Sequence, residues 1–127
     1  MPPLDPKSLL ALVVTDEEVA AHLPASAHIR IFTRASESLL DRFSKIFVSV
    51  PLAGLSAVSE FVKEANERHY LRSFLVRDAD SSNLLPQYLY RANMRSLRNL
   101  IVHADIHVPG RVLKAHVLAA EHDLIAD

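Results

Sequence analysis

The sequence of 127 residues has no cysteine, no tryptophan and only two glycines. Without cysteine, the chain can form no disulfide, zinc–thiolate site or iron–sulfur cluster, and it has no cysteine nucleophile. Small β-barrels and sandwiches use glycine in many tight turns, so an all-β fold is not expected. Two glycines also exclude a glycine-rich phosphate loop and a Gly-x-Ser-x-Gly nucleophile turn.

A long hydrophobic run is lacking as well. The apolar run Leu9–Val14 is far shorter than the roughly 20 residues that span a bilayer. The N-terminus has neither the basic region nor the small-residue cleavage site of a secretory signal. Half of the residues are hydrophobic and 23% are charged, the balance of a globular chain. We therefore expect a single cytoplasmic domain over residues 1–127, with no membrane contact.

Net charge is −1, so the charge of the whole chain gives no argument for nucleic-acid binding. Its distribution is uneven, because residues 1–27 carry a net −3 and residues 84–114 a net +4. The basic residues of the second segment that we expect to contact nucleic acid are Arg91, Arg95, Arg111 and Lys114. The alternative is an ordinary solvated helix face.

Apolar residues recur at steps of three and four along most of the chain, which favours amphipathic helices. Main helices are expected over residues 26–51, 55–76, 86–108 and 111–125. Residues 1–25 are expected to form an arm, with a short helix that begins at a capping box over Thr15–Glu18. No strand is expected. The predicted fold class is all-α: a helical bundle of four main helices, residues 26–127, with a short N-terminal helical arm.

The third of these segments, residues 86–108, is the most regular. Its apolar stripe consists of Tyr90, Met94, Leu97, Ile101, Ala104 and Val108. On a helix, Arg91, Arg95 and Arg98 would form a basic ridge beside this stripe. Asn99 and His103 are four residues apart, so a helix would place them one turn apart on the far side.

The segment Leu97–His103 resembles the signature of HEPN domains, in which an Arg, commonly followed by a polar residue, precedes a His by four to six intervening residues. HEPN domains are all-α bundles of about this size, and many are metal-independent ribonucleases that act as dimers. The resemblance implies that Arg98 and His103 are catalytic and that Asn99 supports them. One departure is Asp105, which stands where toxins of this group have a modified tyrosine.

These residue types suit RNA cleavage without a metal or cofactor. The 2′-hydroxyl of RNA can attack the adjacent phosphate, His103 can move the proton, and the fork of Arg98 can hold the phosphate. A metal site at His103 and His107 is less expected, because no glutamate lies between them. The first hypothesis is thus a HEPN-like endoribonuclease or RNA-binding homodimer. The alternative is a non-enzymatic helical protein-interaction module, such as an adaptor, an immunity or antitoxin-like partner, or an assembly subunit.

Overall fold

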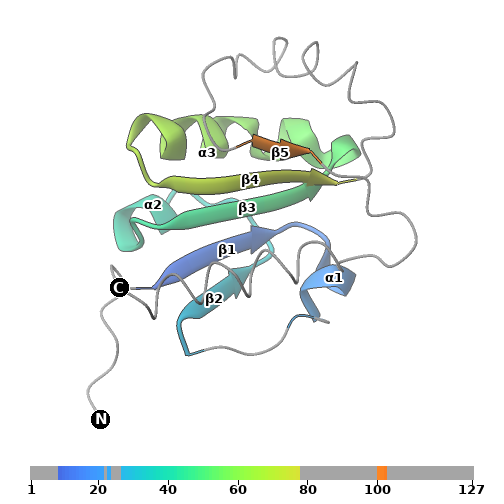
Figure 1. Cartoon of the computed structure of the whole chain (residues 1–127), viewed down its shortest axis with the longest axis horizontal. Coiled ribbons are helices and arrows are strands. Elements are labelled where there is room, and N and C mark those ends of the chain that lie inside the picture. The colour runs from blue at the N-terminus through green and yellow to red at the C-terminus, as the bar shows by residue number, and fades with distance from the viewer. Residues whose placement is uncertain (1–8, 22, 24–26, 78–99, 103–127) are drawn as a thin grey trace.

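A parallel β-sheet, flanked by helices on both faces, forms the centre of this protein (Figure 1). The computed structural model describes residues 9–21, 23, 27–77 and 100–102. In chain order the elements are β1 (Leu10–Val14), α1 (Glu17–Ala21), β2 (Ile29–Phe32), α2 (Leu39–Arg42), β3 (Ile46–Pro51), the 3-10 turn η2 (Leu52–Gly54), α3 (Leu55–Glu67), β4 (Leu71–Arg77) and β5 (Leu100–Val102). The five strands lie in the order β2-β1-β3-β4-β5, and every neighbouring pair is parallel.

The fold is therefore α/β, and the prediction of an all-α helical bundle is wrong. Residues 26–51, expected as one helix, contain β2, α2 and β3. The helix expected over 55–76 ends at Glu67, and β4 follows it. Leu100–Val102, expected within a helix, forms β5. Two helix starts are confirmed, at Glu17 and at Leu55.

The error has a physical cause in how buried parallel strands are composed. Such strands are covered on both faces, so they consist of nearly continuous apolar residues instead of alternating ones. Leu10–Val14 is fully apolar and fully buried, and Ile46–Val50 is interrupted only by Ser49. Steps of three and four can be drawn through any continuous apolar run, so spacing alone cannot separate a buried strand from a helix.

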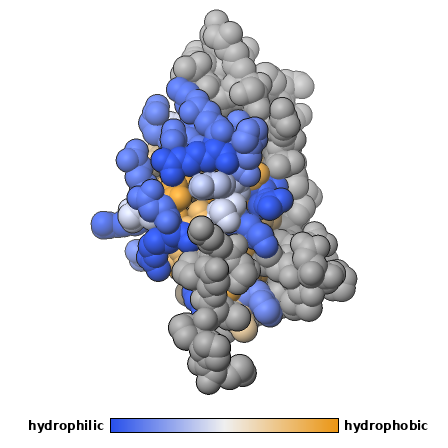
Figure 2. Space-filling view, turned by 90° about the vertical axis from the view of Figure 1, so that its left-hand side faces the viewer, coloured by the Kyte–Doolittle hydropathy of each residue, from blue (hydrophilic) through white to orange (hydrophobic). Residues whose placement is uncertain are grey.

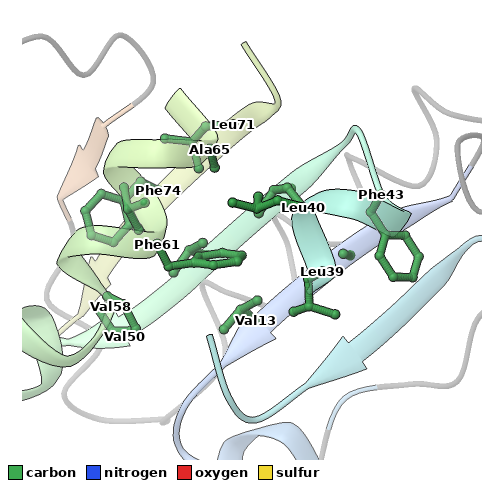
Figure 3. Packing of buried hydrophobic residues seen from close by; sticks show 14 of the residues in the cluster. Val13, Leu39, Leu40, Phe43, Val50, Val58, Phe61, Ala65, Leu71 and Phe74 are labelled. Atoms are coloured by element: carbon green, nitrogen blue, oxygen red, sulfur yellow. The ribbon is translucent and has the colours of Figure 1, made fainter. Parts of the chain in front are cut away.

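The two faces of the sheet are covered by different helices. Alternate residues of β1, such as Ala11 and Val13, pack in one cluster with residues of α2 and α3, whereas Leu10, Leu12 and Val14 pack in a second cluster with Val19 of α1. Figure 3 shows part of the first cluster, where side chains of α2 and α3 lie over the sheet. From β1 the chain crosses to β2 on one side of the sheet. From β2 it returns past β1 to β3 and then to β4, in the opposite direction across the sheet. Right-handed crossovers then place α1 opposite α2 and α3.

At the amino edge of the sheet, Arg68 connects α2 with the end of α3. Its Nε donates to Glu64 Oε1 at 2.9 Å, and its Nη1 lies 3.7 Å from Asp41 Oδ1. The hydrogen bond to Glu64 is the main reason that the pKa of Arg68 is raised above its ordinary value. Figure 2 shows this side of the molecule as a hydrophilic surface around a small apolar area. Because these charges are exposed, the ion pairs contribute little to stability.

Helix α3 ends in a Schellman motif centred on His69. The Tyr70 amide donates to the Ala65 carbonyl at 2.9 Å and the His69 amide to the Asn66 carbonyl at 3.0 Å. His69 has a φ of 61°, in the left-handed region that favours glycine. A helix end marked by histidine instead of glycine gives little sequence signal, which explains why the spacing pattern does not predict the end at Glu67.

Replacement of His69 by glycine is expected to stabilise the protein by about 0.5–1 kcal/mol, because glycine adopts this φ without a Cβ clash. Urea denaturation measures the change. Glu67→Gly is the matched control, since Glu67 lies within α3 and the same substitution there should cost about 1 kcal/mol. A loss of stability in His69→Gly would contradict the prediction.

Within the described ranges, no helix combines the length and the apolar character that a bilayer crossing requires.

Candidate functional site at the carboxyl edge of the sheet

The carboxyl ends of β1 and β3 lie side by side at a point where the chain changes direction. The two strands are adjacent and parallel, but β1 connects to β2 on one side and β3 connects to β4 on the other. In doubly wound sheets this divergence leaves a crevice outside the carboxyl ends, and ligands bind there. Figure 1 shows this edge where the strand arrowheads of β1, β3 and β4 converge. The residues at these strand ends therefore form the candidate site.

Arg77, the last residue of β4, is the central residue of this edge. Its Nε donates to Ser49 Oγ of β3 at 2.9 Å, and its Nη2 donates to Asp16 Oδ1, directly after β1, at 2.6 Å. The side chain thus crosses from β4 over β3 to β1. Ser49 and Arg77 are on the same face of the sheet because Arg77 pairs with Pro51, two residues beyond Ser49.

Burial makes these contacts necessary. The Arg77 side chain is 3% exposed, and a buried guanidinium is tolerated only when it is paired and hydrogen-bonded. Ser49 is neutral, so Asp16 is the residue that compensates the charge. Asp16 itself is 29% exposed and lies in the connection between β1 and α1. The pair therefore has one fixed member, Arg77, and one member at the solvent boundary.

The connection after β3 lies against the connection after β1. A methyl group on Gly54 would lie 3.8 Å from Thr15 Oγ1, and the Thr15 hydroxyl in turn lies 3.5 Å from Asp16 Oδ1. Gly54 precedes α3, whose first turn contains no acidic residue and whose N-cap makes no side-chain hydrogen bond. The helix continues directly from η2, and the amide of its first residue, Leu55, donates to the Leu52 carbonyl.

Two buried serines of this sheet face differ in their partners, which gives a matched test. Ser49 Oγ accepts the bond from Arg77, whereas Ser73 Oγ, in a residue 7% exposed, has no partner within the described part of the chain. Ser49→Ala should cost about 1.5–3 kcal/mol, because it leaves a charged donor unpaired. Ser73→Ala should be neutral or stabilise by up to about 1 kcal/mol. Thermal or urea unfolding measures both, and equal losses would contradict the assignment.

The catalytic residues predicted from the HEPN resemblance lie outside the described residues. Arg98 and Asn99 precede β5 in the sequence, and His103 follows it. Because β5 is a strand, the placement of Asn99 and His103 one turn apart on a continuous helix is wrong. The roles assigned to the three residues stay predictions. Arg91, Arg95, Arg111 and Lys114 also lie outside the described residues.

The sequence analysis did not single out Ser49 or Arg77, and it used Asp16 only as part of a helix-capping segment. A usable signal existed, since Thr15-Asp16 follows one apolar β-rich run and Arg77 ends another. Polar residues at the ends of buried parallel strands meet at one edge of the sheet. Polar residues at strand ends can be recognised only when the strands themselves are predicted, and the all-α prediction contains no strand.

The described residues contain no group of three or more His, Asp or Glu side chains that could hold a metal ion. What the edge offers is a buried guanidinium, hydroxyl groups, a carboxylate and a helix N-terminus. Groups of these types can bind and orient a polar ligand, and among them there is no nucleophile–base pair. The chain matches no family model, no curated protein and no solved structure.

Proposed function

We propose that this chain is a binding domain that takes a small polar molecule at the carboxyl edge of its sheet, between β1 and β3. The observation that supports this most is the buried Arg77, which is held at that edge by Ser49 and Asp16. A buried ion pair is often no more stable than an apolar replacement, so its presence at the point where doubly wound sheets bind ligands favours a role in recognition.

The described residues divide into two roles in this proposal. Thr15 and Asp16 lie at the boundary with solvent, where the ligand would enter. Ser49 and Arg77 are buried, and Ser49 would hold the guanidinium of Arg77 in position beneath them. Gly54 lies against Pro51 and Thr15 and places the connection after β3 beside this entrance.

The proposal is tested by titrating the isotope-labelled protein with ATP, glucose 6-phosphate, citrate, glutamate and spermidine, and following its amide resonances. At least one of them should shift the amides of Thr15, Asp16 and Gly54 and raise the melting temperature, because a ligand that binds only the native state stabilises it. Shifts confined to the amino edge, around Lys45 and Arg68, would contradict the proposal, as would the absence of any shift.

A pair of threonine variants sharpens this test. Thr15 follows β1 at the proposed site, and Thr33 follows β2 at the same edge but away from the junction of β1 and β3. Thr15→Val should weaken the binding several-fold, since it removes a hydroxyl that lies within the site. Thr33→Val should leave the affinity unchanged. Equal effects of the two substitutions would place the ligand elsewhere.

The ribonuclease function implied by the HEPN resemblance stays a prediction with its own test. It requires that the purified protein cleave single-stranded RNA in the presence of EDTA and that His103→Ala abolish this cleavage. His116→Ala is the control and should retain the activity. A binding domain without nuclease activity leaves the RNA intact in all three proteins. The dimer, the protein partner and the cytoplasmic location likewise remain predictions.

A further inference from the structure

The contact between Asp16 and Arg77 joins a solvent-boundary carboxylate to a buried cation. One hydrogen bond, from Nη2 to Oδ1, makes the contact, although a guanidinium can bind a carboxylate or a phosphate through two parallel bonds. Arg77 is fixed by burial and by Ser49, whereas Asp16 is 29% exposed in a connection between two elements. The carboxylate can therefore turn toward water when another anion compensates Arg77, whereas the guanidinium cannot leave.

We propose that the Asp16–Arg77 pair is the closed form of an oxyanion site, in which a phosphate or carboxylate group of the ligand takes the place of the Asp16 carboxylate on Arg77. This inference rests on the proposed function and names the ligand chemistry of the same edge. In the open form, Asp16 faces solvent and the oxyanion accepts the hydrogen bond from Arg77 Nη2. Asp16 is then an internal competitor that occupies the site in the absence of a ligand.

Other groups at this edge suit an oxyanion in that position. Thr15 Oγ1 lies 3.5 Å from the Asp16 oxygen that an incoming oxygen would replace, so the hydroxyl can donate to it. Gly54, immediately before α3, lies near Thr15, and the first turn of α3 contains no acidic residue that would repel an anion.

The test is a titration with inorganic phosphate of the wild-type protein, of Asp16→Asn and of Glu17→Gln. The carboxamide of Asp16→Asn is neutral and therefore a weaker competitor, so phosphate should bind this variant at least ten-fold more tightly than the wild type. Glu17→Gln removes the same charge from the next residue, which is exposed at the start of α1. Glu17→Gln therefore controls for the change in net charge. It also controls for the general stabilisation of proteins by phosphate, which is excluded from protein surfaces.

The readout is the Nε–H resonance of Arg77, which is bonded to Ser49 Oγ and thus reports on the guanidinium itself. This resonance should shift on addition of phosphate in Asp16→Asn and, at higher concentration, in the wild type. Equal phosphate affinity in Asp16→Asn and Glu17→Gln, or an unchanged Arg77 resonance in the wild type at saturating phosphate, would overturn the inference. The wild-type measurement decides the question even where the variant does not fold.

Failure of this inference is distinguishable from failure of the proposed function. If phosphate leaves the Arg77 resonance unchanged while a molecule such as spermidine shifts the amides of Thr15 and Gly54, the oxyanion site is refuted and the binding domain stands. If no molecule shifts these amides, both are refuted.

Discussion

Asp16→Ala is expected to destabilise the protein by about 3–5 kcal/mol, because the substitution leaves the guanidinium of Arg77 buried without a compensating charge. Domains of this size have a free energy of unfolding of about 5–15 kcal/mol, so the loss is a large part of the total. Asp16→Asn keeps an oxygen that can accept from Arg77 Nη2 and should cost only about 1–2 kcal/mol. Urea denaturation of the three proteins measures the series.

Substitution of Arg77, the other member of the pair, provides a control in which the buried charge itself is removed. Arg77→Met removes the same ion pair but leaves Asp16, which can be solvated, and fills the buried volume with an apolar side chain. It should therefore cost about 1 kcal/mol, less than Asp16→Ala. Glu17→Gln, at an exposed neighbouring position, should change stability by less than about 0.5 kcal/mol. Equal losses for Asp16→Ala and Arg77→Met would show that burial of Arg77 does not control the energetics.

Phe74→Ala should cost about 3–5 kcal/mol, because it empties a fully buried position in an interior strand of the sheet. Phe74 lies in β4 between Val48 of β3 and Leu100 of β5, and its side chain belongs to the cluster covered by α3 (Figure 3). The structure around it is held by backbone pairing on both sides, so the cavity cannot collapse fully. The decrease in the urea midpoint, at unchanged slope, measures the loss.

Two comparisons separate the cavity from other effects. Phe74→Leu retains most of the volume and should cost less than about 1.5 kcal/mol. Phe32→Ala removes the same side chain from edge strand β2, where Phe32 is half-buried and packs edge-to-face on Phe43 at 5.5 Å. It should cost at most about 2 kcal/mol. If Phe74→Ala lowers the free energy of unfolding no more than Phe32→Ala does, the interior position of β4 in the sheet is contradicted.

Local signals in the sequence predicted where α1 and α3 begin, but they predicted neither α2 as a separate helix nor any of the strands. Leu55, Val58, Phe61, Val62 and Ala65 follow helical spacing because α3 has one buried face, and these five residues are its buried positions. Strands β1, β3 and β4 are buried on both faces, so their pattern carries no period of two. Ile46–Val50 could still have been recognised by its β-branched residues and by Pro51 at its end.

The site could not be predicted from local spacing because its members come from three strand ends. Asp16, Ser49 and Arg77 approach one another only when β1, β3 and β4 are neighbours in the sheet. The motif from Arg98 to His103 was predicted to lie on one continuous helix, but Leu100–Val102 within it form β5. Strand order decides which polar residues meet, and no single segment contains that information.

The separation of Asp16 and Arg77 along the chain, 61 residues, has a consequence for the folding rate. Closing so long a loop costs entropy that is recovered only once β1–β3 and β3–β4 pairing has brought the strand ends together. We therefore expect the ion pair to form after the rate-limiting step, and interactions absent from the transition state slow unfolding without accelerating folding. On this expectation the pair lengthens the lifetime of the native protein more than it speeds its formation.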